Sequence, residues 1–118
     1  MIAVVDDEES VRKALERLIR SAGFAVETFA SGSAFLESAR YAQPSCVVLD
    51  LHMPGMSGFE VQGALALEHA GVPVVIITGH DTPEARTRAL RLGAKAYLCK
   101  PVDDEALLAA IGGAAAGH

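Results

Sequence analysis

The fold is decided by an arrangement that first appears in the sequence IAVVDD at residues 2–7, where a short apolar run ends on two carboxylates. The same arrangement returns in CVVLD at residues 46–50. Short, continuous apolar runs are typical of strands that are covered on both faces of a parallel sheet. In an open α/β sheet the carboxyl ends of the strands share one edge, and ligands bind in the crevice there. We therefore expect Asp6, Asp7 and Asp50 to meet at one edge of such a sheet.

Apolar runs alternate with amphipathic stretches along the whole chain, which predicts repeated βα units around a parallel sheet. We expect five strands and five helices in a single domain. The strands are expected at residues 2–5, 24–29, 45–49, 72–78 and 94–99. Four of these runs are nearly continuously apolar, whereas residues 24–29 are partly polar and fit an edge strand.

The helices are predicted from apolar spacing and from end signals. Apolar residues recur every three or four positions between residues 11 and 22, and Gly23 follows. A second amphipathic stretch covers residues 58–70. Thr82 and Pro83 are typical of a helix start, Gly93 is expected to end that helix, and Asp103 is expected to cap the last one. The Ala- and Gly-rich residues 113–118 are expected to be a tail or the start of a linker after a domain of residues 1–112.

The composition excludes several classes of protein. The 118 residues are 51% hydrophobic and 21% charged, which is typical of one globular domain and not of a disordered chain. A net charge of -5 without a basic cluster argues against direct nucleic-acid binding. The start lacks the basic region of a secretory signal, and we expect a cytoplasmic protein that does not contact membranes. Cys46 and Cys99 lie in apolar runs, and both are expected to be buried, reduced thiols.

The expected acidic edge needs a cation. Two unit charges about 4 Å apart repel by roughly 4 kcal/mol at an effective dielectric near 20. Two candidates for the cation are Mg²⁺, which favours oxygen ligands, and Lys100, which follows the apolar run 96–99. Right-handed crossovers also bring Thr78 to the same edge. Carboxylates, a hydroxyl and a lysine at one strand edge suit phosphoryl transfer, which needs mainly positioning and stabilisation of charge.

Four motifs resemble those of the receiver domain of bacterial two-component response regulators, and the likeness covers essentially the whole chain. They are VVDDE at residues 4–8, VLDLHMPGMSG at 48–58, ITGH at 77–80 and KP at 100–101. The second and third are most similar to the FixJ-type branch, whose members usually join a receiver to a helix-turn-helix DNA-binding domain. The resemblance implies a doubly wound, flavodoxin-like sheet of five parallel strands in the order 2-1-3-4-5.

The resemblance also implies the roles of the site residues. Asp50 would accept a phosphoryl group from the phosphohistidine of a sensor histidine kinase, with Mg²⁺ as cofactor and with Lys100 and Thr78 beside the transferred group. Asp7 would bind Mg²⁺ directly, Asp6 largely through water, and the backbone carbonyl of His52 would be a further ligand. The peptide bond between Lys100 and Pro101 would be cis, a form ordinarily confined to X-Pro bonds.

In this family phosphorylation moves the threonine, here Thr78, and an aromatic residue of the last strand, here Tyr97. The readout would be the face of the fourth helix, fifth strand and fifth helix, which would control a transcriptional output domain. The alternative is a free-standing receiver that acts through protein–protein contacts or a phosphorelay. Arg86, Arg88 and Arg91 lie on the fourth helix, with Glu84 spaced to pair with Arg88. Our hypothesis is that these arginines form a phosphorylation-dependent dimer or effector contact. A solvated helix surface is the alternative.

Two histidines are predicted in the loops beside the site. His52 and His80 would overhang the pocket, either as solvated loop residues or as groups that titrate near neutral pH or capture a transition metal.

We expect no enzyme activity beyond the domain's own phosphoryl transfer and dephosphorylation. A dehalogenase-like phosphatase would carry a second aspartate where His52 stands, and a nucleotide- or flavin-binding module would carry a glycine-rich phosphate motif. A degenerate receiver that only binds is disfavoured by the intact set of Asp7, Asp50, Thr78 and Lys100.

Overall fold

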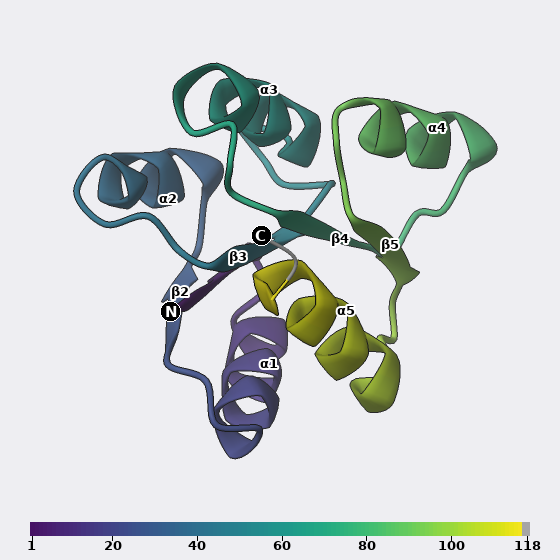
Figure 1. Cartoon of the computed structure of the whole chain (residues 1–118). Coiled ribbons are helices and arrows are strands. Elements are labelled where there is room, and N and C mark those ends of the chain that lie inside the picture. Colours follow the sequence, from purple (N-terminus) through teal and green to yellow (C-terminus); the bar gives the residue numbers. More distant parts are fainter. Residues whose placement is uncertain (117–118) are drawn as a thin grey trace.

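The computed structural model describes residues 1–116 and alternates between strand and helix along the whole of that range (Figure 1). There are five strands and five helices in it, as expected. Their bounds in chain order are β1 (Ile2–Val5), α1 (Glu9–Ser21), β2 (Val26–Phe29), α2 (Gly32–Ala39), β3 (Cys46–Asp50), α3 (Gly58–Glu68), β4 (Val74–Thr78), α4 (Pro83–Arg91), β5 (Ala96–Cys99) and α5 (Asp104–Ala116).

The five strands form one sheet in the order β2-β1-β3-β4-β5, and every neighbouring pair is parallel. This confirms the doubly wound fold and the strand order that the resemblance implied. The partly polar β2 is an edge strand, as its composition predicted, and β5 is the other edge. The register aligns Val5 of β1 with Leu49 of β3. The next residues, Asp6 and Asp50, therefore lie side by side at the end of these strands.

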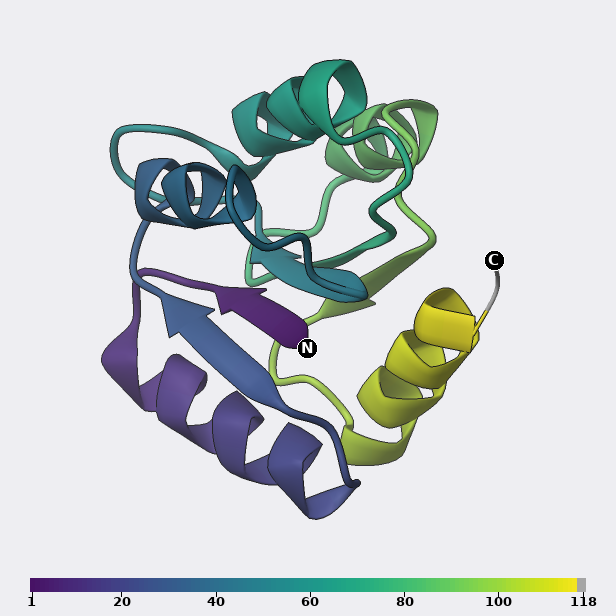
Figure 2. The same cartoon turned by 60° about the vertical axis from the view of Figure 1, so that its left-hand side comes forward.

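Helices cover both faces of the sheet, with α1 and α5 on one face and α2, α3 and α4 on the other (Figures 1 and 2). Alternate residues of each strand therefore enter different cores. In β1, Ala3 and Val5 pack into the cluster beneath α2 and α3, while Ile2 and Val4 pack into the cluster beneath α1 and α5. Burial on both faces explains why the central strands are apolar without interruption.

The helix ends follow the sequence signals. The Thr82 hydroxyl accepts a hydrogen bond from the Ala85 amide at 3.0 Å, one residue before Pro83 opens α4. The Asp103 carboxylate caps α5 by accepting from the Ala106 amide at 2.9 Å. Gly93, which follows α4, has a φ of 101°, a left-handed conformation that costs glycine little because it has no Cβ.

Element boundaries differ from the predicted ranges by about two residues. The strands β2, β4 and β5 begin two residues later than the apolar runs that predicted them, and α3 ends at Glu68. The last helix, α5, continues past residue 112 to Ala116 and buries Ala114, because alanine is the strongest helix former. The rest of the expected tail, residues 117–118, lies outside the described residues. None of the helices in residues 1–116 has the length and apolar character needed to cross a bilayer.

One prediction about the cysteines is wrong. Cys46 in β3 is buried, and burial raises the pKa of its thiol to about 12. Cys99, by contrast, is exposed. It is the last residue of the edge strand β5, which has a neighbour on one side only and is less covered than the central strands. An apolar run alone does not distinguish an edge strand from a central one.

Candidate functional site

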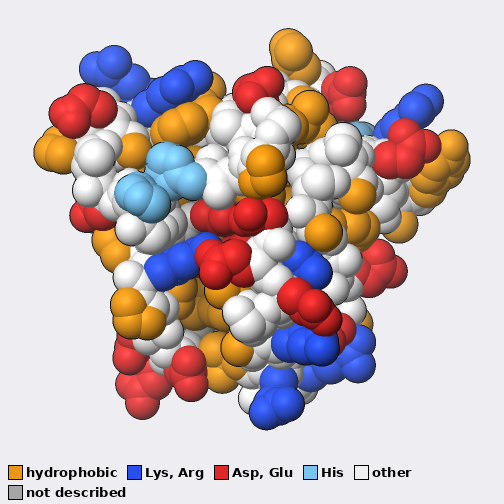
Figure 3. Space-filling model, turned by 180° about the vertical axis from the view of Figure 1, so that it is seen from behind, with side chains coloured by type: hydrophobic (Ala, Val, Ile, Leu, Met, Phe, Trp, Pro, Cys, Tyr) orange, Lys and Arg blue, Asp and Glu red, His pale blue; other side chains and the backbone are white. Residues whose placement is uncertain are grey.

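The three predicted carboxylates meet at the carboxyl edge of the sheet. Asp6 directly follows β1, Asp7 comes next, and Asp50 is the last residue of β3. One oxygen from each lies within 4.8 Å of the others, and this set could hold a metal ion. Asp6 and Asp50 are buried, while Asp7 is exposed. Figure 3 shows acidic side chains at the centre of this face, with a basic side chain against them.

Lys100 supplies a positive charge inside this acidic cluster. Its Nζ lies 2.9 Å from Asp6 Oδ2 and 3.6 Å from Asp50 Oδ1. The contact with Asp6 has the distance of an ion pair but not the orientation of a hydrogen bond. The backbone holds Lys100 in place, because its amide donates to the Thr78 carbonyl at 2.7 Å. The peptide bond to Pro101 is cis, as the resemblance implied.

The charges around Asp50 oppose one another. Burial, and then the neighbouring carboxylate of Asp6, raise the pKa of Asp50 to about 6, against a smaller lowering by Lys100. For Lys100, burial lowers the pKa, but the carboxylates of Asp6 and Asp50 outweigh burial and raise it. A cluster in which a buried acid is destabilised by other acids favours the arrival of a further cation.

Thr78 is buried at the end of β4, on the strand next to Asp50. Its hydroxyl oxygen accepts a hydrogen bond from the His80 amide at 3.1 Å. In the loop after β3, the His52 amide donates to Asp50 Oδ1 at 3.4 Å. The two loops that leave β3 and β4 are thus each tied to a predicted site residue by a backbone amide.

Gly58, the first residue of α3, lies against the backbone of the acidic strand end. A Cβ placed on Gly58 would come 2.5 Å from the Asp50 carbonyl oxygen and 2.7 Å from Leu51 Cα. The Gly58 amide donates to the Leu51 carbonyl at 2.9 Å. Only glycine allows this approach, which fixes the segment that follows Asp50.

Tyr97 lies at the centre of β5 and is buried. Among the described residues its hydroxyl has no hydrogen-bond partner, and burial, followed by the nearby carboxylate of Asp81, raises its pKa. The Arg86 guanidinium lies 5.4 Å from the centre of its ring, a cation–π contact. The predicted aromatic residue thus contacts α4 directly.

The three arginines of α4 do not form one uniform patch. Arg86 lies over Tyr97, whereas Arg88 lies 4.2 Å from the ring centre of Phe59 in α3. The predicted ion pair between Glu84 and Arg88 does not occur in the described part of the chain, because Arg88 turns to Phe59 instead. Arg91 is exposed in the last turn of α4.

Two contributors to the site were not predicted. Glu8 Oε1 lies 3.4 Å from Lys100 Nζ, and Arg12 donates to the Asp6 carbonyl at 2.8 Å. Glu8 belongs to the acidic motif at residues 4–8, so its sequence position was a usable signal. Arg12 comes from the first turn of α1, and only the three-dimensional path of the chain places its side chain near β1.

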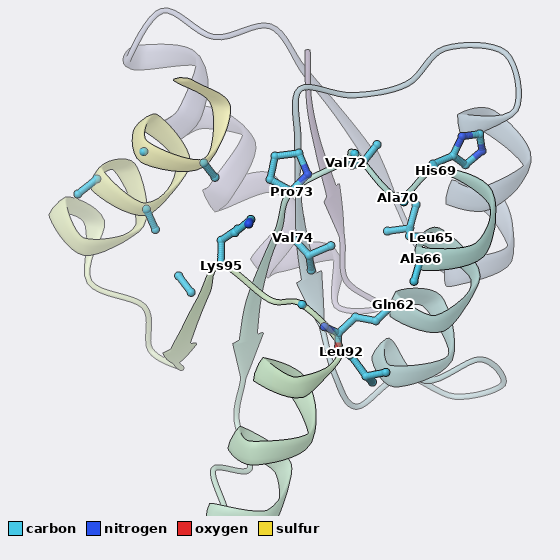
Figure 4. Close-up of a pocket in the computed structure, with 17 residues that line it drawn as sticks. Gln62, Leu65, Ala66, His69, Ala70, Val72, Pro73, Val74, Leu92 and Lys95 are labelled. Carbon is cyan, nitrogen blue, oxygen red and sulfur yellow. The ribbon is translucent and has the colours of Figure 1, made fainter. Parts of the chain in front are cut away.

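A hollow of about 680 Å³ lies away from this site, between α3, the start of β4 and α5 (Figure 4). Gln62, Val74 and Lys95 are among its lining residues, and no carboxylate is. The acidic cluster, in contrast, lies at the ends of β1 and β3. The candidate site therefore rests on the strand ends and not on this hollow.

Among known protein families, the response regulator receiver domain matches this chain over residues 2–112. The transcriptional regulatory protein FixJ of Azorhizobium caulinodans is 38% identical over 110 residues, which cover 93% of this chain and 52% of that protein. The chain thus spans about half the length of the curated relative.

Solved structures show the same fold. The response regulator StyR matches with a TM-score of 0.86 and 50% identity, over 94% of this chain and 56% of that one. The Vibrio cholerae chemotaxis protein CheY4 matches with a TM-score of 0.88 and 31% identity, over 94% of both chains. Both resemblances extend over nearly the whole sheet and its helices.

Proposed function

This chain belongs to the response regulator receiver domain family, and from that premise we propose that it is a phosphorylation-dependent signalling switch of a two-component system. Asp50 accepts a phosphoryl group from the phosphohistidine of a sensor histidine kinase. The observation that carries this proposal is the burial of Asp50 at a strand end, with Lys100 Nζ at 3.6 Å and two further carboxylates beside it.

The chemistry uses the residues at the strand ends. An oxygen of the ionised Asp50 attacks phosphorus, the bond from phosphorus to the imidazole nitrogen of the kinase breaks, and the imidazole leaves. The Lys100 ammonium and the Thr78 hydroxyl stabilise negative charge on the phosphoryl oxygens. Because Lys100 already lies among the acids, it needs only a small movement to reach the new group.

Mg²⁺ is the cofactor that suits this donor set. Three carboxylates with oxygens within 4.8 Å of one another offer the hard oxygen ligands that Mg²⁺ prefers. The backbone carbonyl of His52 would be a further ligand. Asp7 is exposed and accessible to an ion, while Asp6 is already engaged with Lys100, which supports a direct role for Asp7 and a water-mediated one for Asp6. When bound, Mg²⁺ neutralises charge on the acids and on the transferred group.

The signal passes from Asp50 to the face of α4, β5 and α5. A phosphoryl group adds nearly two negative charges and three acceptor oxygens, which draw the Thr78 hydroxyl away from the His80 amide. Tyr97 then changes its packing, and its contact with Arg86 carries the change to α4. The proposed contact for a phosphorylation-dependent homodimer or an effector is the exposed surface of α4, along which Arg86, Arg88 and Arg91 lie.

The proposed output is control of transcription, because the relative FixJ is named a transcriptional regulatory protein and this chain matches 52% of it. A second candidate is a free-standing receiver that acts by protein–protein contact or in a phosphorelay, since CheY4 is matched over 94% of its own chain. In either case the kinase acts on this domain in the cytoplasm. The domain binds neither nucleic acid nor membrane and catalyses only its own phosphoryl transfer and dephosphorylation.

Incubation with acetyl phosphate and Mg²⁺, followed by intact mass measurement, tests the proposal. We expect one added phosphoryl group on the parent protein and none on the Asp50→Asn variant. Chelation of Mg²⁺ with EDTA should abolish the addition. An unmodified parent protein, or equal modification of the variant, would show that this chain only binds partners or that another residue reacts.

A further inference from the structure

Two histidines form a pair beside the acidic cluster. His52, in the loop after β3, and His80, in the loop after β4, have ring centres 5.2 Å apart and ring planes 72° apart. Both residues are exposed to solvent. Figure 3 shows histidine side chains gathered into one patch at the edge of the acidic group.

The backbones beneath the two imidazoles are held in place. The His52 amide donates to the Asp50 carboxylate at 3.4 Å, and the His80 amide donates to the Thr78 hydroxyl at 3.1 Å. The two side chains thus start from loop residues whose amides are tied to the last residues of β3 and β4, two strands that pair in register. Ligands held on rigid elements lose less entropy when they close around an ion.

The donor chemistry of the pair differs from that of the acids. Imidazole nitrogens suit zinc, copper and nickel, while carboxylates and carbonyls suit magnesium and calcium. Each neutral imidazole offers one nitrogen lone pair, and a zinc–nitrogen bond is about 2.0–2.1 Å long. Two imidazoles whose centres are 5.2 Å apart can therefore share one ion after a rotation of their exposed rings. Water would complete its coordination.

We propose that His52 and His80 bind one transition-metal ion of the zinc, copper or nickel class, at a site separate from the carboxylates of Asp6, Asp7 and Asp50. The ion joins the loop after β3 to the loop after β4. Because these loops border Asp50 and Thr78, the bound ion slows phosphorylation of Asp50. This last consequence rests on the proposed function, whereas the binding itself does not.

Calorimetric titration of the untagged, unphosphorylated protein with Zn²⁺, in Mg²⁺ sufficient to occupy the carboxylates, tests the site. We expect one ion per chain, and at least about tenfold weaker binding in His52→Gln and in His80→Gln. The control is His69→Gln, because His69 lies at the end of α3 and bonds Gln43 at 2.7 Å. This control should bind Zn²⁺ as the parent does. All three variants change partly or fully exposed side chains, and thermal melts establish that they fold.

Two results would overturn the site: equal Zn²⁺ affinity in the parent and both pair variants, which would place the ion on the carboxylates, or no binding by the parent at about 1 mM Zn²⁺. The effect on phosphorylation is measured separately with acetyl phosphate and Mg²⁺. Zn²⁺ should slow the parent severalfold and leave His80→Gln unaffected; equal slowing of both would overturn the link between the loops and Asp50. If the parent is never phosphorylated, the proposed function fails, and the titration still decides the metal site.

Discussion

Asp50 is an acid that the folded protein disfavours in its ionised form. Its pKa is raised from 3.8 to about 6, chiefly by burial and by the carboxylate of Asp6. The folded state therefore holds the proton more tightly than the unfolded state. The resulting stabilisation is fully present below about pH 3.8 and is lost as the pH rises through about 6. At neutral pH, without metal, the ionised Asp50 costs stability.

We therefore predict that Asp50→Asn is more stable than the parent in EDTA at pH 8, by about 1–3 kcal/mol. The gain should shrink as the pH falls from 6 to 4, because the parent then recovers its proton. Urea unfolding at several pH values measures the difference. Glu27→Gln, a change at an exposed acid of β2, is the control and should show no such pH-dependent gain. A constant difference between pH 4 and 8 would contradict the raised pKa of Asp50.

Some residues of the site could be predicted from the sequence, and others could not. Asp6, Asp7, Asp50, Thr78 and Lys100 could be found because each follows or ends an apolar run, and strand ends of a parallel sheet converge. Arg12 could not, since an arginine in a first helical turn usually faces solvent. The different neighbours of Arg86 and Arg88 could not be predicted either, because the positions of two residues on one helix do not show which adjacent element each side chain contacts.

At the scale of elements, the position of Asp50 depends on how closely α3 approaches β3. The first residue of α3, Gly58, leaves no room for a Cβ against the Asp50 carbonyl oxygen and Leu51 Cα. Both neighbours are backbone atoms of a buried segment, so they cannot turn aside as a flexible side chain would. The start of α3 is therefore a structural support of the site.

Gly58→Ala is expected to lower the free energy of unfolding by about 1–3 kcal/mol and to slow phosphorylation of Asp50. The reason is that the added methyl group displaces the segment that follows Asp50. Gly63→Ala in the same helix is the matched control. Apart from the adjacent residues and the backbone of its own helix, nothing lies within 4 Å of a Cβ at Gly63, and alanine should stabilise the helix there by about 0.5–1 kcal/mol. Urea unfolding and the phosphorylation rate check both variants. Equal stabilisation by the two changes would refute the close approach of Gly58.

The contact between α4 and β5 yields a second prediction at this scale. A cation–π contact at a partly desolvated site is worth about 1 kcal/mol, so loss of the Arg86 guanidinium should shift Tyr97 toward exposed positions about fivefold. The chain has two tyrosines and no tryptophan, and Tyr41 is 81% exposed. In a Tyr41→Phe background, fluorescence therefore reports Tyr97 alone.

Acrylamide quenching of that fluorescence should increase in Arg86→Gln. Arg88→Gln is the control, since it removes the contact with Phe59 but leaves Tyr97 covered. If Tyr97 fluorescence is quenched to the same extent in Arg86→Gln and in the control, Arg86 does not keep Tyr97 buried. The proposed contact from Tyr97 to α4 would then not transmit the signal.

The elements themselves were predicted better than their limits. Five strands and five helices follow from alternating apolar and amphipathic stretches, and the caps at Thr82 and Asp103 follow from residue type. The starts of β2, β4 and β5 could not be predicted in this way. Apolar residues just before a strand are buried by the same core, but they make no hydrogen bonds to a neighbouring strand. The exposure of Cys99 was missed for a related reason: sheet order decides which strand is an edge, and apolarity does not.

For the whole molecule, the question is how a change at Asp50 reaches a partner. The end of α4 and the residue that follows it carry exposed apolar side chains close to the arginines in sequence: Leu90 and Leu92 are 46% and 37% exposed. Apolar side chains flanked by cations are typical of interaction surfaces. Arg91 is exposed in the last turn of α4 and, unlike Arg86 and Arg88, makes no cation–π contact within residues 1–116.

We predict that phosphorylated protein self-associates about tenfold more weakly when Arg91 is replaced by alanine, a loss of about 1.4 kcal/mol. Analytical ultracentrifugation after treatment with acetyl phosphate and Mg²⁺ measures the association. Arg17→Ala, an exposed change on α1 at the other face of the sheet, should leave it unaltered. Unchanged association of the phosphorylated Arg91→Ala variant would remove Arg91 from the proposed interface.

We propose that Asp50 is a phosphoryl acceptor inside a cluster that Lys100, Thr78 and a metal ion complete. A crystal structure grown with Mg²⁺ and beryllofluoride, a mimic of the phosphoryl group, tests it most directly. We predict beryllium on an Asp50 carboxylate oxygen, Lys100 Nζ and Thr78 Oγ1 within about 2.7–3.2 Å of its fluorines, and Mg²⁺ bound by Asp7 and Asp50. A structure with beryllofluoride on another residue, or with Mg²⁺ away from these acids, would show that Asp50 and its neighbours are not the phosphoryl-acceptor site.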